Sequence, residues 1–360
     1  MKGVIGGQLK WMNGTFYILK YLEYFFVFFI ALAHIKTIKQ IKFYIFAILL
    51  TFFIVNICAA VQIGHGIRVS APFEGLRGEP NTLGGYQVLI IALTIGLIIY
   101  KNFLNYKYIL LGLTIFSLIP FTYTLSRASY SAIIPMYLSF IWLIKSKARN
   151  FLLGILILLI IVSMFFFPQN IKSRITDAFT PDRWTQAETI GDIKLGGSAS
   201  ERIRSWKIVI EKWKEKPFWG HGVTSIGFLD GQYFRILGEL GLLGLTAFLL
   251  LIYHIIRLSF KYYRMTKNNL LKGIALGFIA GNIGLLVHAI TANTFIIIRI
   301  MEPYWLLAAI VMSIPYVDPD LQPIQNTNES NTPARPHPPN PLKLKIKNPH
   351  LAILLKGRTH

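Results

Sequence analysis

The chain has 360 residues, of which 54% are hydrophobic and only 15% are charged, and its mean hydropathy is +0.51. Soluble domains carry about a quarter charged residues, so this composition excludes a soluble enzyme, a disulfide-rich secreted scaffold and a disordered chain. The single cysteine, Cys58, excludes an intramolecular disulfide. The formal net charge of +21 would suit nucleic acid, so the position of that charge has to be examined.

Apolar residues come in blocks of about twenty flanked by Lys or Arg, which is the pattern of membrane-spanning helices. The sequence therefore predicts an all-α, polytopic integral membrane helix bundle. We predict nine spans, at residues 16–33, 42–63, 85–100, 108–125, 129–144, 150–167, 235–256, 273–290 and 295–314.

Alternate loops between these spans differ in charge. One set holds thirteen cations and no acidic residue: Lys36, Lys39, Lys42, Lys101, Lys107, Lys145, Lys147, Arg149, Arg257, Lys261, Arg264, Lys267 and Lys272. The positive-inside rule assigns this set to the cytoplasm. Most of the net charge is therefore a topology signal, and no nucleic-acid partner is predicted.

The chain divides into a transmembrane bundle, residues 1–314, and a tail, residues 315–360. The bundle includes one large extracytoplasmic loop, 168–234, in which Glu201–Lys216 has the apolar spacing of an amphipathic helix. The tail is rich in Pro and basic residues, so we predict a disordered cytoplasmic segment.

Charged residues at the outer ends of spans are costly unless they are paired or used. The candidates are Arg77, Arg127, Glu239 and Arg299. Arg127 follows Ser126 in a sharp turn between two spans, where its planar guanidinium suits a diphosphate or a carboxylate. The alternative is an arginine that reaches lipid headgroups. Arg77 lies in a Gly-, Pro- and Asn-containing stretch, 75–86, that predicts a tight loop.

The long loop returns to the membrane at Asp230, close to several arginines. A carboxylate there is either a general base or an ion-pair partner. His65, His221 and His288 have no metal-ligand spacing, and no phosphate-binding loop or dinucleotide fingerprint is present. We therefore predict no metal and no cofactor.

Together these segments resemble the O-antigen ligase/polymerase superfamily of bacterial surface-polysaccharide assembly. Four motifs carry the resemblance in the right order: Arg77-Gly78 to Gly84, Leu125-Ser126-Arg127-Ala128-Ser129, Glu201-Arg202 to Gly222, and Asp230 to Gly244. Members usually have more spans in a GT-C-like bundle, so the resemblance implies that N-terminal helices are absent here.

The resemblance implies a metal-independent, inverting glycosyltransferase of the inner (cytoplasmic) membrane. Its donor substrates are polyprenyl-diphosphate-linked oligosaccharides, and its active site lies on the extracytoplasmic face. Arg127 and Arg202 match arginines that hold the donor diphosphate. Ligases carry a His-Asn pair where this chain has Asp230-Gly231, which favours a polymerase with Asp230 as the base. Flippase and chain-length regulator proteins are the implied partners, besides membrane lipid.

Further residues complete the predicted site around the catalytic candidates Asp230, Arg127 and Arg202. We expect Arg77, Asn81, Ser126, Tyr233 and Trp206 to bind substrate, although core packing is an alternative for Tyr233 and Trp206. Two alternatives to a polymerase remain, a ligase of the same superfamily and a lipid-glycan flippase. A flippase should carry polar residues along several spans, but the mid-span polar set is sparse (Asn56, Asn282 and His288).

Overall fold

A computed structural model describes residues 2–64, 68–72, 78–100, 107–144, 149–154, 157, 189–190, 193–194, 197–227 and 229–321. Four predicted features lie wholly or mostly outside these residues: Arg77, the sixth span, the first half of the 168–234 loop and the tail beyond Leu321.

Five of the described helices are long and apolar enough to cross a membrane. They are α1 (Lys2–His34, apolar from Gly14), α2 (Ile38–Val61), α3 (Pro80–Ile99), α9 (Gln232–Met265) and α10 (Asn269–Thr291). Shorter helices complete the bundle: α4 (Lys107–Tyr123), α5 (Arg127–Leu143), α11 (Ile298–Met312) and α12 (Ile314–Val317). The prediction of an all-α polytopic membrane fold is confirmed.

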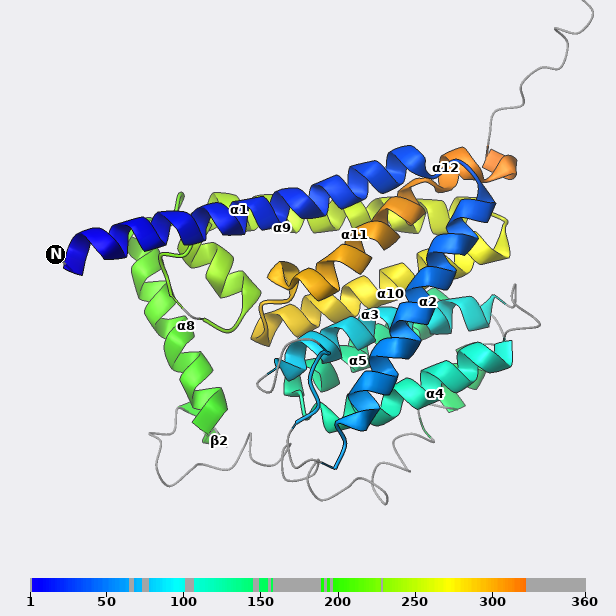
Figure 1. The fold of residues 1–360 in the computed structure, drawn as a ribbon, viewed down its shortest axis with the longest axis horizontal. Helices are drawn as coiled ribbons and strands as arrows, with labels where there is room; N and C mark the ends of the chain where they lie inside the picture. Colours follow the sequence, from blue (N-terminus) through cyan, green and yellow to red (C-terminus); the bar gives the residue numbers. More distant parts are fainter. Residues whose placement is uncertain are drawn as a thin grey trace, which may run out of the picture. The chain divides into compact units, whose positions relative to one another are not determined.

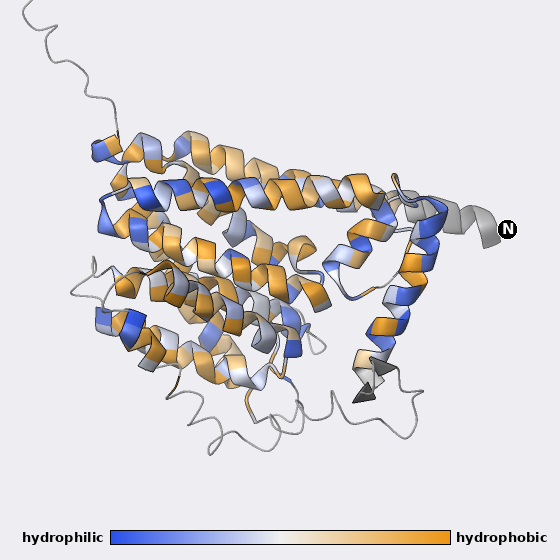
Figure 2. Ribbon diagram, turned by 180° about the vertical axis from the view of Figure 1, so that it is seen from behind, coloured by the Kyte–Doolittle hydropathy of each residue, from blue (hydrophilic) through white to orange (hydrophobic). Residues whose placement is uncertain are grey.

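The remaining elements are small or lie outside the bundle. They are the two-residue strands β1 (Thr189–Ile190) and β2 (Ile193–Lys194), the amphipathic helix α8 (Gly197–Glu215), and the 3-10 turns η1 (Thr294–Ile296) and η2 (Pro319–Leu321). α8 covers most of the predicted 201–216 helix. Figure 2 shows its alternating hydrophobic and hydrophilic stripes.

The helix α3 begins earlier than the sequence predicts. Residues 80–86 were expected in a tight loop, but they form the first two turns of α3. Pro80 occupies the first helical position, where its missing N–H costs nothing. The following glycines are therefore helical, and the loop prediction for 80–86 is wrong.

The centre of the bundle is the pair α3 and α10, whose apolar segments are 83% and 78% buried. Small residues allow this contact, because a Cβ on Gly96 would lie 2.3 Å from the Gly273 carbonyl oxygen. Such close approach lets backbones pack in a membrane, where no hydrophobic force drives helices together. α1 and α2 instead expose large apolar side chains such as Phe26, Phe29 and Phe43, as lipid contact requires.

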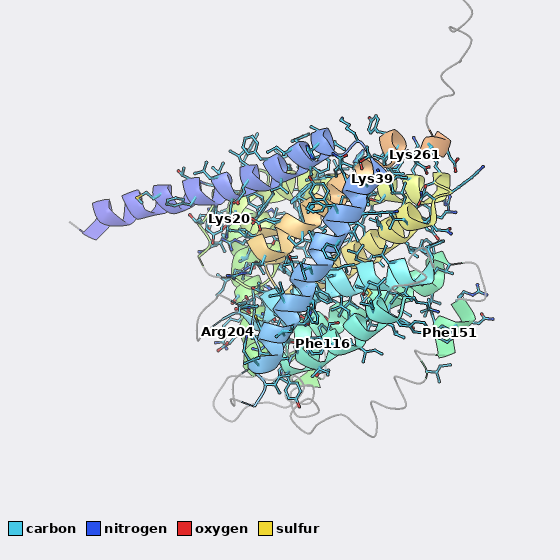
Figure 3. The ribbon with its side chains drawn as sticks, turned by 45° about the vertical axis from the view of Figure 1, so that its right-hand side comes forward. Lys20, Lys39, Phe116, Phe151, Arg204 and Lys261 are labelled. Atoms are coloured by element: carbon cyan, nitrogen blue, oxygen red, sulfur yellow. The ribbon has the colours of Figure 1, made fainter. Side chains whose placement is uncertain are left out.

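The loops of the bundle gather at two ends. At one end the Tyr100 and Tyr263 hydroxyls lie 2.7 Å apart, and Thr266 is hydrogen-bonded to Asp318; we call it the Thr266 end. At the other, the η1 end, α3 and α5 begin and η1 joins α10 to α11 (Figure 1). Lys39 and Lys261 lie toward the Thr266 end and Arg204 at the η1 end (Figure 3). The loops are thus grouped as the alternating charge pattern predicts.

Which end faces the cytoplasm can be measured by labelling with an impermeant thiol reagent in a Cys58→Ala background. Because the basic loops belong to the Thr266 end, we expect Arg204→Cys to react in intact cells. Lys261→Cys should react only after permeabilisation. The reverse labelling would contradict the orientation and place the candidate site on the cytoplasmic side.

Candidate functional site

The turn between α4 and α5 presents Arg127 at the η1 end. Leu125 has a positive φ of 49°, and Ser126 caps α5 by accepting a hydrogen bond from the Ser129 N–H at 3.2 Å. The Arg68 guanidinium donates to the carbonyl oxygens of Thr124 and Leu125, at 3.0 and 3.1 Å. Arg127 is therefore the first residue of a capped helix, where the helix dipole favours anions.

Two of the predicted substrate-binding residues meet at this turn. The Ser126 hydroxyl donates to Asn81 Oδ1 at 2.6 Å, and Asn81 Nδ2 donates to Glu79 at 2.6 Å. Gly84 makes the approach of α3 to α5 feasible, because a Cβ there would lie 2.0 Å from Ser129 Oγ. The start of α3 and the turn before α5 thus form one polar cluster.

A second cluster joins α8 to the segment before α9. Arg202 Nε and Nη2 each lie 3.4 Å from Asp230 Oδ2, and both side chains are partly exposed, at 24% and 33%. Trp206 Nε1 donates to the Asp230 main-chain oxygen at 2.8 Å. Its indole stacks on Phe234 with centroids 4.5 Å apart. The structure therefore brings together three of the candidate residues, Asp230, Arg202 and Trp206, and Phe234 covers one face of the indole.

Tyr233 points into the bundle instead. Its hydroxyl donates to the Leu286 carbonyl oxygen at 2.7 Å, and its ring packs edge-on against Phe248. This geometry favours the packing role that the sequence left as the alternative to sugar binding.

The connection from α10 to α11 borders both clusters. Asn293 Nδ2 donates to the Leu229 carbonyl oxygen at 2.6 Å, and the Phe295 N–H donates to Gln232 Oε1 at 3.1 Å. Between them, Thr294 is hydrogen-bonded to His288, which lies 3.2 Å from Ser129. Arg127 and Asp230 therefore lie on segments that share a neighbour at the η1 end.

The Pro217–Gly222 motif fills a break in α9. At Gly241 the helix is interrupted by a φ of 67° and a ψ of −165°, so backbone groups on both sides lose their helical partners. Four backbone hydrogen bonds from the motif replace them: Leu242 N to Pro217 O, Leu243 N to Phe218 O, His221 N to Gly238 O and Gly222 N to Glu239 O. The motif therefore stabilises α9 at its break.

The other charged candidates, Glu239 and Arg299, differ in their surroundings. Glu239 Oε1 accepts from Arg235 Nε at 3.2 Å and from the Thr224 N–H at 3.1 Å, and both charged side chains are buried. The Arg235 guanidinium also lies over the Tyr17 ring, 4.9 Å from its centroid. Arg299 is exposed on α11. Among the described residues, no group of three His, Cys, Asp or Glu could hold a metal ion.

The sequence does not predict three features of this region: the role of Arg68, the role of Thr294, and the contact between His288 and Ser129. Arg68 stands in a loop whose fold is not local, and Thr294 has no charge to attract attention. The sequence marks His288 only as a mid-span polar residue. The one available signal was that each lies within a few residues of a predicted outer turn.

The fold is that of a polytopic membrane protein, and the two polar clusters at the η1 end of its bundle form a candidate site. Residues 112–249, from α4 to the middle of α9, match the family model described as O-antigen ligase. The resemblance to the O-antigen ligase/polymerase superfamily is therefore confirmed, and it supports an enzyme of glycosyltransferase type. No curated protein matches the chain.

Proposed function

We propose that this protein is a polysaccharide polymerase, an inverting and metal-independent glycosyltransferase of the cytoplasmic membrane. On the outer face it would join oligosaccharide repeat units carried on polyprenyl diphosphate. The observation that carries the proposal is the Asp230 carboxylate, held by Arg202 at 3.4 Å where the long loop enters α9. Ligases of the superfamily have a histidine at this position.

In this proposal the Asp230 carboxylate accepts the proton. Oδ2 accepts from Arg202, whereas Oδ1 contacts no donor among the described residues. In the proposed step, an acceptor sugar hydroxyl loses its proton to Asp230 while its oxygen bonds to the anomeric carbon of the donor. The bond from that carbon to the diphosphate oxygen breaks, so the polyprenyl diphosphate leaves with the electron pair.

Negative charge grows on the departing diphosphate, and preorganised donors stabilise it best. Arg127 at the capped start of α5 is the principal donor in this proposal, and Arg202 is the second. Arg77 would support them. Asn81 and Ser126 fix the turn that carries Arg127 and line the same end of the bundle.

A transport path receives less support. The mid-span polar residues Asn56, Asn282 and His288 are fully buried. Each is hydrogen-bonded to another side chain: Asn56 to Gln87, Asn282 to Tyr304, and His288 to Ser129 and Thr294. Polar groups that line a path would have to face it. A flippase and a chain-length regulator therefore enter the proposal as partners only.

The glycan pattern of a deletion strain tests the proposal. We expect single-repeat glycans without the gene and a ladder of lengths when the wild-type gene is returned. Asp230→Asn removes the base but keeps the size, so at normal protein levels it should lower polymerisation by about 10²-fold or more. A complete lipid-linked polymer left unattached in the deletion strain would indicate a ligase. Repeat units trapped on the cytoplasmic face would indicate a flippase.

A further inference from the structure

A chain of hydrogen bonds runs from the α10–α11 connection to the start of α3. It begins at Thr294 Oγ1, 2.7 Å from His288 Nδ1, and continues from His288 Nε2 to Ser129 Oγ at 3.2 Å. Ser129 Oγ lies 2.8 Å from Ser126 Oγ, which reaches Asn81 at 2.6 Å. Thr294, His288, Ser129 and Ser126 are all 0% exposed. The chain thus joins helices that are far apart in the sequence.

The direction of these hydrogen bonds fixes the state of the imidazole. The Asn81 oxygen can only accept, so Ser126 donates to it, and Ser129 in turn donates to Ser126. Ser129 Oγ has then used its proton and must accept from His288 Nε2–H. In the neutral imidazole Nδ1 then carries no proton, and it accepts from the Thr294 hydroxyl. The chain therefore selects one neutral tautomer of His288.

The imidazole has little room to move. A Cβ on Gly85 would lie 2.6 Å from Ile300 Cδ1 and 3.1 Å from His288 Cε1. Gly84 stands in the same relation to Ser129. The two glycines let α3 press directly against the chain, so its geometry is set by packing as well as by hydrogen bonds.

The arrangement is suited to holding parts in place rather than to moving protons. A relay needs groups that accept a proton on one atom and release it from another. The Asn81 amide does not do so, since its oxygen accepts and its nitrogen is a donor only. What the chain connects is informative: Ser126 directly precedes Arg127, and Thr294 lies between Asn293 and Phe295, which contact the segment around Asp230.

We propose that His288 is a positioning residue that fixes the turn carrying Arg127 relative to the segment carrying Asp230. It acts through Ser129 and Ser126 on one side and through Thr294 on the other, and it does not touch substrate. Its effect on the reaction rests on the proposed function. Its effect on the position of the turn does not.

The test has two arms. In the first, Arg127→Cys in a Cys58→Ala background is labelled with an impermeant thiol reagent. His288→Leu removes both hydrogen bonds of the imidazole, so we expect the labelling rate to rise about tenfold as the turn opens more often. His288→Gln can still donate toward Ser129 and should restore most of the wild-type rate. Ser129→Ala removes a link of the hydrogen-bond chain but leaves the buried imidazole in place, so its labelling rate should equal that of His288→Leu. The double variant Ser129→Ala with His288→Leu should show no further increase in rate.

Asn282→Leu is the matched control. Asn282 is also fully buried on α10, and its side chain donates to the Tyr304 hydroxyl at 2.9 Å, outside the chain. We expect it to leave the labelling rate within twofold of wild type. An unchanged rate in His288→Leu, a His288→Gln no better than His288→Leu, or an equal rise in Asn282→Leu would overturn the proposal.

In the second arm, polymerisation of purified lipid-linked repeat units is measured with Arg127 intact. Because charge on the diphosphate grows in the transition state, misplacing the turn should lower kcat by about 10–100-fold and change KM for the donor less than about threefold. A wild-type kcat in His288→Leu would overturn the role in the reaction. If the wild-type protein itself forms no polymer, the proposed function fails, and the labelling rates still decide whether His288 positions the turn.

Discussion

Replacing Arg127 by lysine should lower the rate of polymerisation by about 10²–10³, because it removes the forked donor from a preorganised anion site. Lysine keeps the charge but cannot donate two parallel hydrogen bonds to a diphosphate. Arg127→Ala should be inactive. If Arg127 only reached lipid headgroups, lysine would serve equally well. The measurement is the glycan ladder at normal protein levels in the membrane, and a wild-type ladder in Arg127→Lys would contradict the diphosphate role.

The helix α8 offers a matched pair of arginines for the same argument. Arg202 contacts Asp230 and its side chain is 24% exposed, whereas Arg204, two residues further along the helix, is exposed. We expect Arg202→Ala to lose activity about as severely as Arg127→Lys, since Asp230 loses its partner and the donor loses a cation. Arg204→Ala should stay near wild type. Equal damage from both substitutions would assign Arg202 to the stability of α8.

Much of the fold could be predicted because a membrane restricts the solutions. Apolar blocks must form helices there, and alternate loops must share an end. The exact start of α3 could not be predicted, because Pro80 and the glycines that follow it are residues typical of loops. They are helical because Gly84 and Gly85 meet Ser129 and His288, which lie on helices that the local sequence does not describe.

The candidate site was predictable where charge marks it. An aspartate among arginines near one membrane surface left Asp230 as either a base or an ion-pair partner, and the structure shows its contact with Arg202. The apolar spacing of Glu201–Lys216 predicted a helix there, but not the surface that Trp206 would face. Contacts between uncharged polar residues could not be predicted, because no pattern in the sequence indicates them. Ser129 and His288 are 159 positions apart, and neither residue type at its position signals the other.

Breaking the junction between the Pro217–Gly222 motif and α9 should cause the largest loss of stability. Gly241 adopts a φ of 67° and a ψ of −165°, a region that is essentially restricted to glycine. A Cβ there would lie 2.3 Å from the Phe218 oxygen, and one on Gly220 would lie 2.6 Å from the Glu239 oxygen. These neighbours are backbone atoms, so they cannot turn aside as a side chain would.

Gly241→Ala or Gly220→Ala should therefore cost about 3 kcal/mol or more of folding free energy, from backbone strain of ~1–3 kcal/mol and the added clash. Two controls separate these causes, because Gly222 has a φ of 95° and Gly112 is helical, and a Cβ added to either would meet no atom within 4 Å. Gly222→Ala should cost only the strain. Gly112→Ala should be neutral or stabilise by up to about 1 kcal/mol. Melting temperature in detergent and protein level in the membrane measure the effect. Equal stability of Gly241→Ala and Gly112→Ala would mean that α9 is not broken at Gly241, and that the Pro217–Gly222 motif does not pack against its backbone there.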